Sequence, residues 1–153
     1  RHNIGYWTRE NYLGLGLGAA SLVDNVRYSN TRELDEYTAI CHDLTILPPE
    51  AFAPEDGMAA PERNWFGSNL HTEASVVSRK SQMEEFMFLG LRMTDGIARD
   101  EFEHNFGMPI EAAYVQVLPE LQAQGLIEKR EGRIYLTDRG MDVANYVMAQ
   151  FLL

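Results

Sequence analysis

The densest group of side chains that could do chemistry lies at the start of the chain, in the sequence His2-Asn3-x-x-Tyr6-Trp7. An imidazole, an amide, a phenol and an indole this close together could supply a metal ligand, a hydrogen-bond donor and flat faces that stack on a planar ligand. The alternative is structural, with the Tyr6 and Trp7 rings packed beneath a sheet. Spacing alone favours that alternative, so these residues by themselves do not define a site.

A second group is an alternation of leucine and glycine between Tyr12 and Ser21, with bare positions at Gly14, Gly16 and Gly18. Period-two alternation predicts a strand with one face free of side chains, which a ligand or a neighbouring backbone could approach closely. The spacing is G-x-G-x-G rather than the dinucleotide pattern G-x-G-x-x-G. A second short strand is expected next, at about residues 23–28, so no phosphate-binding helix follows.

Residues that bind metals are few. The single cysteine, Cys41, excludes an internal disulfide and a Cys₄ cluster, and we expect it to be a small buried residue on an apolar helix face. His42, His71 and His104 are scattered, with no pair at metal-ligand spacing. The composition is that of a folded domain, because 45% of the 153 residues are hydrophobic.

The net charge of −10 argues against nonspecific binding to nucleic acid or to anionic lipid. No apolar run approaches the roughly 20 residues that cross a bilayer, so we expect no integral membrane segment. The chain begins inside a patterned segment without a Met, from which we expect a piece of a larger protein.

Three zones follow from the pattern. Residues 1–30 hold the two predicted strands, which cannot fold alone and must belong to a larger sheet. Residues 31–80 hold a helix over 33–41, with Thr31 as its N-cap, and then an acidic, proline-rich loop over 47–71.

Residues 81–153 hold the best-defined elements. A capping box predicts a helix from Ser81, a helix over 99–106 ends at a glycine, and a third over 110–124 should be kinked by Pro119. Two strands around Glu131-Gly132 form a hairpin, and a last helix follows Thr137. This order, with helices before a small hairpin, predicts a winged-helix-like C-terminal domain within an α+β protein.

A winged helix suggests DNA, but the charges do not. Between Met108 and Glu128 there is no Lys, Arg or His, whereas a helix in the major groove needs basic or amide groups. Basic residues occur in the hairpin, beside two glutamates. A structural or docking domain is the better interpretation, and nucleic acid is not an expected partner.

Several stretches resemble, in order, the radical S-adenosylmethionine proteins related to oxygen-independent coproporphyrinogen III oxidase, and in particular the HemW branch, described as heme chaperones. The resembling stretches are 2–7, 12–21, Arg27-Tyr-Ser-Asn30, 85–97, 102–107 and Leu136-Thr-Asp-Arg-Gly140. The resemblance implies that residues 1–30 are the last strands of a truncated radical-SAM (β/α) barrel. It also implies that the cluster motif Cys-x-x-x-Cys-x-x-Cys lies outside this chain, so the chain should be inactive alone.

The resemblance further implies a site. The motif H-N-x-x-Y-W is associated with heme binding in the HemW branch, and it transfers onto His2, Asn3, Tyr6 and Trp7. His2 becomes a candidate ligand of the heme iron, and the glycines become candidate cofactor contacts. The full-length parent would carry a 4Fe-4S cluster and S-adenosylmethionine, neither of which we expect on this chain.

Three functions follow as hypotheses. The first is binding of heme for transfer to acceptor hemoproteins, in the cytoplasm. The second is the oxidase or dehydrogenase reaction on coproporphyrinogen III in porphyrin biosynthesis, and the third is a winged-helix nucleic-acid-binding module.

Overall fold

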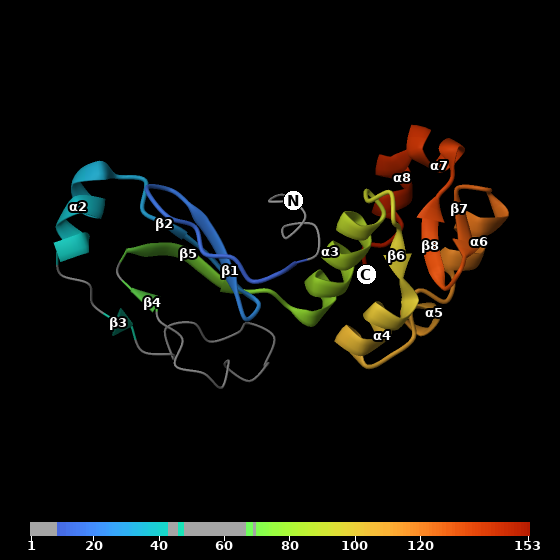
Figure 1. The fold of residues 1–153 in the computed structure, drawn as a ribbon, viewed down its shortest axis with the longest axis horizontal. Helices are drawn as coiled ribbons and strands as arrows, with labels where there is room; N and C mark the ends of the chain where they lie inside the picture. The colour runs from blue at the N-terminus through green and yellow to red at the C-terminus, as the bar shows by residue number, and fades with distance from the viewer. Residues whose placement is uncertain (1–8, 43–45, 48–66, 69) are drawn as a thin grey trace. The chain divides into compact units, whose positions relative to one another are not determined.

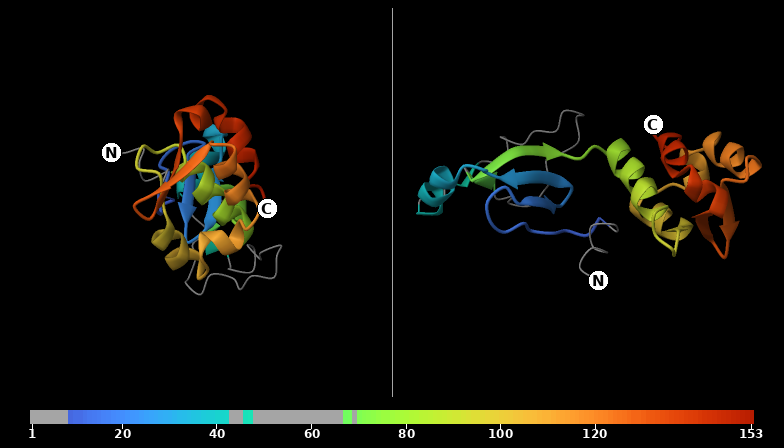
Figure 2. Two further views of the ribbon diagram at one scale, coloured as in Figure 1. Left: turned by 90° about the vertical axis from the view of Figure 1, so that its right-hand side faces the viewer. Right: turned by 90° about the horizontal axis from the view of Figure 1, so that it is seen from above.

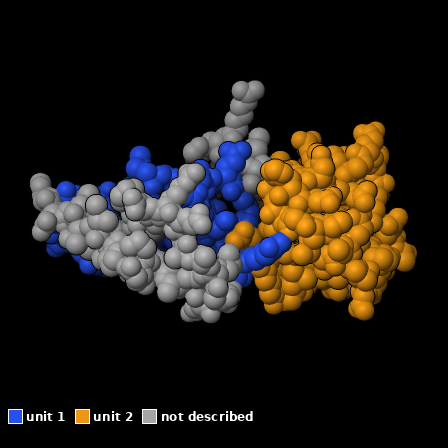
Figure 3. All heavy atoms as spheres, turned by 90° about the horizontal axis from the view of Figure 1, so that it is seen from below, with its two compact units in different colours: residues 1–79 blue, residues 80–153 orange. Residues whose placement is uncertain are grey.

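A computed structural model describes residues 9–42, 46–47, 67–68 and 70–153. The chain divides into two compact units, residues 1–79 and residues 80–153, which are coloured separately in Figure 3. The residues of the predicted motif at positions 2–7 and most of the acidic loop lie outside the described residues.

Unit 1 is built on a three-stranded antiparallel sheet in the order β1-β2-β5, seen in Figure 1. Its strands are β1 (Ala20–Val23), β2 (Val26–Asn30) and β5 (His71–Val76). Asp24 and Asn25 join β1 to β2 with φ of 49° and 63°. Two successive left-handed residues of these types make the tight turn that a two-residue hairpin needs.

The sheet differs from the prediction in three ways. The second strand was expected at about residues 23–28, but β2 begins only at Val26, because Asp24 and Asn25 form the turn before it. The leucine–glycine stretch was expected to be a strand, yet β1 begins only at Ala20, and Tyr12 forms a single bridge with Leu22. Strand β5 was not predicted, although it pairs with β2 along most of its length. All pairs are antiparallel, whereas neighbouring strands of a (β/α) barrel run parallel, so the barrel assignment remains a prediction.

Helix α2 (Leu34–His42) forms where a helix was predicted, and it extends beyond one end of the sheet in Figures 1 and 2. Its position leaves its side chains uncovered by the sheet. Leu34 is 63% exposed and Cys41 is exposed. The expectation of a buried cysteine on an apolar face was therefore wrong. Two short strands follow, β3 (Ile46–Leu47) and β4 (Gly67–Ser68), which pair with each other.

Unit 2 packs helices around a single apolar core, together with a second three-stranded sheet in the order β6-β8-β7. Its elements are α3 (Arg79–Gly90), β6 (Ile97–Ala98), α4 (Arg99–Phe106), α5 (Ile110–Ala113), α6 (Val117–Ala123), β7 (Ile127–Arg130), β8 (Arg133–Leu136), α7 (Asp138–Asp142) and α8 (Ala144–Ala149).

Aromatic rings fill the centre of that core. Phe102 and Phe106 lie with their ring centroids 4.6 Å apart, and Phe86 meets both edge-on at 5.6 Å. Such edge-to-face contacts add to the free energy gained by burying the rings. Helix α4 and the β7–β8 hairpin match their predicted bounds closely, because a terminal Gly107 at φ 61° and a Glu131-Gly132 turn at φ 51° and 75° specify their ends locally.

Longer helices were predicted less well. The helix expected over 110–124 is interrupted at residues 114–116, just before Pro119, rather than kinked within one continuous element. Proline lacks an N–H for the residue 115 carbonyl and crowds that carbonyl, so the break falls in the preceding turn. The last helix is also split, at Val143, and α3 begins at Arg79, which places Ser81 inside the helix instead of at its cap.

Within the described part of the chain, no helix is long and apolar enough to cross a membrane.

Candidate functional site

The glycine segment forms a loop that turns into β1, seen in blue ahead of that strand in Figure 1. Gly16 has φ of 101° and Gly18 has φ of 64°. Residues that carry a Cβ adopt such positive φ values only at a cost in free energy. A Cβ on Gly14 would lie 2.3 Å from the Ala20 carbonyl oxygen. Each glycine is therefore needed for the conformation of the loop itself, which we call the glycine loop (residues 13–18).

Buried polar side chains hold the glycine loop. Asn30, which is 4% exposed, donates from Nδ2 to the Gly16 carbonyl at 2.8 Å and to the Gly14 carbonyl at 3.4 Å. The hydroxyl of the fully buried Ser21 accepts a hydrogen bond from the Gly14 N–H at 3.0 Å. Carbonyls and N–H groups that would otherwise need water are thus bonded within the protein.

Thr31 links the same loop to the start of α2 and to Leu70, the residue before β5. Its carbonyl accepts from the Gly18 N–H at 2.9 Å, and its own N–H donates to the Leu70 carbonyl at 2.8 Å. Its hydroxyl donates to the carboxylate of Glu36 and accepts from the Glu33 N–H at 3.3 Å. Thr31 was predicted as the N-cap of the helix, but α2 begins at Leu34 and the Glu33 carbonyl accepts its first hydrogen bond, so Thr31 lies two residues before the N-cap position. The start of α2 and the end of the glycine loop are therefore held by one residue.

The outer surface of the glycine loop is apolar. Leu13, Leu15 and Leu17 are 63%, 85% and 45% exposed. Open space adjoins Gly16, where an added Cβ would meet no atom of the described residues within 4 Å. The side chain of Arg32 lies across Gly18, with its Cγ 3.3 Å from the position of such a Cβ.

The structure does not test the predicted heme contacts. His2, Asn3, Tyr6 and Trp7 lie outside the described residues, so only Gly14, Gly16 and Gly18 of the predicted site are placed. No group of three His, Cys, Asp or Glu that could hold a metal is found among the residues that are described. His71 instead lies against the Tyr28 ring at 4.2 Å, and burial lowers its pKa below the ordinary value.

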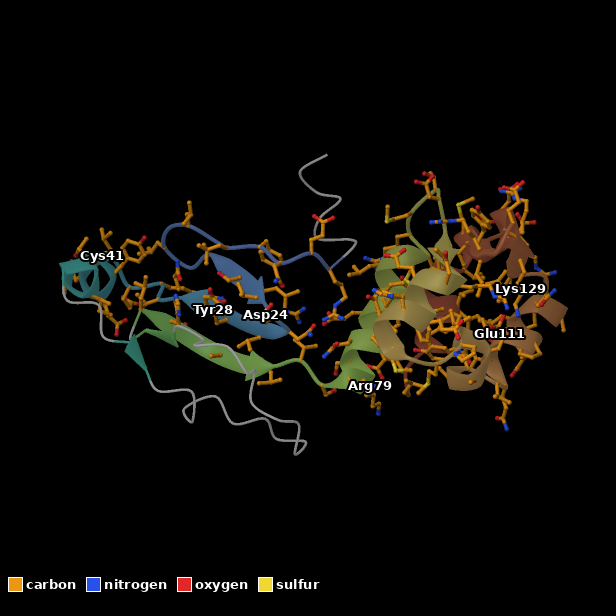
Figure 4. All side chains as sticks on the ribbon, turned by 60° about the horizontal axis from the view of Figure 1, so that its bottom comes forward. Asp24, Tyr28, Cys41, Arg79, Glu111 and Lys129 are labelled. Atoms are coloured by element: carbon orange, nitrogen blue, oxygen red, sulfur yellow. The ribbon has the colours of Figure 1, made fainter. Side chains whose placement is uncertain are left out.

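In unit 2, the basic residues of the hairpin are used within the protein. Glu111 accepts from Arg99 at 2.7 Å and from Lys129 at 3.2 Å, and the Glu111 and Lys129 side chains can be followed in Figure 4. Burial alone would raise the Glu111 pKa. Its backbone hydrogen bond and these two cations outweigh that effect and bring the pKa below the usual range.

The other two basic residues of the hairpin are also engaged. Arg133 donates to the carbonyls of Asp95 and Gly96. Arg130 pairs with Glu128 at 3.6 Å and lies over the Tyr135 ring at 4.7 Å. These contacts leave the hairpin with little free positive charge for phosphates, in keeping with the weak case for DNA binding made from the sequence.

Comparison with known proteins shows what the chain is similar to. Residues 77–143 match the model of the HemN C-terminal domain. The fold is similar to that of a solved structure of the same name. The solved structure of coproporphyrinogen III oxidase (HemN) from Escherichia coli, a radical SAM enzyme, aligns with a TM-score of 0.57 and 16% identity, over 94% of this chain and 28% of that chain.

The most informative relatives in sequence are two heme chaperones named HemW. The chain is 34% identical over 153 residues to HemW of Lactococcus lactis subsp. lactis (strain IL1403), covering 100% of this chain and 34% of that protein. It is 29% identical over 152 residues to HemW of Bacillus subtilis (strain 168), covering 99% of this chain and 34% of that protein. The chain thus spans about a third of the length of these relatives, and the resemblance to the HemW branch predicted from the sequence is confirmed.

Sequence reasoning missed the residues that shape the glycine loop. Asn30 ends the stretch Arg27-Tyr-Ser-Asn30, which supported the family resemblance but received no role. Ser21 ends the resembling stretch 12–21 but also received no role, and Arg32 was not considered. A buried asparagine at the end of a strand gives no periodic signal in the sequence. Its role depends on hydrogen bonds to the carbonyls of residues 14 and 16, which lie well before it in the chain.

Proposed function

We propose that this chain is the C-terminal part of a HemW-like protein that binds heme and passes it to acceptor hemoproteins. The observation that carries the proposal is the similarity to two HemW proteins over essentially the whole chain, and the motif at His2 to Trp7 of this sequence supports it. In this proposal, His2 ligates the heme iron or contacts the heme edge, and Asn3, Tyr6 and Trp7 complete the contacts. Neutral imidazole is a common iron ligand, and aromatic rings stack well on a porphyrin.

The glycine loop contributes to the same site. It follows the motif within a few residues, and its conformation is fixed by hydrogen bonds from buried side chains. A rigid loop with bare backbone suits contact with a bound cofactor, because little conformational entropy is lost on binding. Gly14, Gly16 and Gly18 act mainly by permitting this conformation.

Unit 2 is a winged-helix-like domain with a role in protein contacts rather than in reading DNA. Its hairpin cations are paired with carboxylates or bonded to carbonyls. In the complete protein, a 4Fe-4S cluster and S-adenosylmethionine would be held by the barrel of which residues 1–30 form the last strands. One cysteine could not provide that cluster here.

The experiment is a spectroscopic titration of the whole protein with heme. Imidazole ligation should give a shifted Soret band in the wild type, and His2→Ala should change both the band position and the affinity. Replacing His2, Tyr6 and Trp7 together should abolish specific binding. Unchanged binding by the triple variant would contradict this assignment of the site.

The same preparation separates heme binding from the oxidase reaction, which the fold alone also permits. The reconstituted protein is incubated with S-adenosylmethionine, coproporphyrinogen III and a one-electron reductant for the cluster. We expect no protoporphyrinogen, and its formation would favour the enzyme.

A further inference from the structure

The exposed face of the glycine loop combines features that a simple connection would not need. Three leucines stand out from it, and no charged side chain occurs between residues 13 and 19. Single exposed leucines are ordinary, but several on one short loop are typical of a binding surface. The ligand suited to such a face is large and apolar.

Hydrogen bonds from buried residues fix the conformation of the glycine loop, although its outer surface is exposed. Ser21, Asn30 and Thr31 are the buried polar residues among those described, and all three bond the glycine loop. Burying polar groups is costly unless they are satisfied, and here their hydrogen bonds are directed at a single surface loop. This arrangement fixes the positions of the leucines before any ligand arrives.

A cation lies at the edge of this apolar face. Arg32 is exposed, and its side chain crosses Gly18. Although Glu33 follows it directly, Arg32 forms no ion pair or hydrogen bond with any of the described residues. A guanidinium with no partner among the described residues can bind a carboxylate through two parallel N–H groups.

We propose that Leu13, Leu15, Leu17 and Arg32 form a second contact face for the tetrapyrrole. The leucines contact the ring, and Arg32 binds a propionate carboxylate. Asn30 is a positioning residue that sets the conformation of the loop and thereby the spacing between the leucines and the guanidinium. This inference rests on the proposed heme binding, and the experiment below separates the two.

The test compares heme with its dimethyl ester, in which both propionates are neutral. In Soret titrations of the whole protein, Arg32→Gln should weaken heme binding about tenfold, the amount expected for one charge-assisted hydrogen-bonded pair, and leave the ester unaffected. The matched control is Arg139→Gln, which removes an exposed arginine of unit 2 and should change neither affinity. Leu15→Ser should weaken both ligands about fivefold, because it removes apolar contact area. Its control is Leu34→Ser on α2, since Leu34 is also an exposed leucine, at 63% against 85% for Leu15.

The role of Asn30 has its own readout. Asn30→Ala should weaken both ligands and speed amide exchange at Gly14 and Gly18. In a protein that already carries Asn30→Ala, Arg32→Gln should reduce heme affinity by a smaller factor than it does in the wild type. The reason is that the guanidinium is then no longer held at the right distance from the leucines. A residue that served stability only would leave the Arg32 effect unchanged.

The outcomes distinguish the two levels of the proposal. If the wild type fails to bind heme, the proposed function is wrong. If the wild type binds heme but Arg32→Gln behaves as Arg139→Gln does, or weakens heme and ester equally, the second contact face is wrong while heme binding stands.

Discussion

Tyr114 is buried in the core of unit 2 with its hydroxyl lacking a partner among the described residues. The side chain is 2% exposed, and its ring lies 6.2 Å from Phe102 and 5.1 Å from Phe151, both edge-on. An unsatisfied buried hydroxyl costs about 1–3 kcal/mol, while the ring itself is well packed. Tyr114→Phe should therefore raise the free energy of unfolding by about 1 kcal/mol, which corresponds to a Tm increase of about 4–8 °C in a unit of this size.

The same hydroxyl predicts a pH dependence. Burial raises the Tyr114 pKa, and the negative charge of Glu84 raises it further. In the unfolded chain the phenol ionises near its usual pKa of about 10, whereas in the folded protein it stays neutral. Above that pH the unfolded state holds fewer protons than the folded state. The free energy of unfolding should therefore fall by up to about 1.4 kcal/mol per pH unit in this range. The Tyr114→Phe variant has no phenol at this position, so this part of the fall should be absent from it.

The assay is thermal and urea unfolding, followed by calorimetry and by helical circular dichroism, from pH 7 to pH 11. Tyr146→Phe is the control, because Tyr146 is 47% exposed and should have little effect on stability at any pH. A clear loss of stability in Tyr114→Phe at pH 7 would refute this reasoning, since it would show that the hydroxyl is bonded in the folded protein.

Three further substitutions test other contacts. Gly140→Ala should destabilise unit 2 by about 3 kcal/mol or more, because the new Cβ would lie 1.9 Å from the Leu126 carbonyl oxygen, and unchanged urea unfolding would contradict the close packing of α7. Glu111→Gln should cost about 0.5–1 kcal/mol at low salt. In the wild type that contribution should fade as the pH falls through the lowered pKa of Glu111, and a salt-independent effect would exclude the ion pairs as its cause. Gly16→Ala should cost about 1–3 kcal/mol through its φ of 101° alone, and amide exchange at Gly18 will show whether the loop has changed.

Locally encoded elements could be predicted from the sequence. Helix α4 and the β7–β8 hairpin carry their end signals within a few residues, in Gly107 and in Glu131-Gly132. The alternation of leucine and glycine predicted a strand that does not form, because a period of two occurs in strands and also in this loop. Positive φ at Gly16 and Gly18 turns the chain instead of extending it.

Contacts between distant residues were the part that sequence could not supply. The pairing of β5 with β2 joins segments more than forty residues apart, and Asn30 reaches back to Gly14 and Gly16. The exposure of Cys41 depends on α2 extending past the end of the sheet, which no helical pattern specifies. In each case a tertiary arrangement, not a local propensity, decided the outcome.

Heme binding by the protein is tested most directly by an equilibrium titration of the whole protein with heme, followed at the Soret band. Specific binding should give a saturable shift with an end point of one heme per protein. The shift should weaken on His2→Ala and disappear when His2, Tyr6 and Trp7 are all replaced. A linear, unsaturable rise, equal in the wild type and the triple variant, would contradict specific binding.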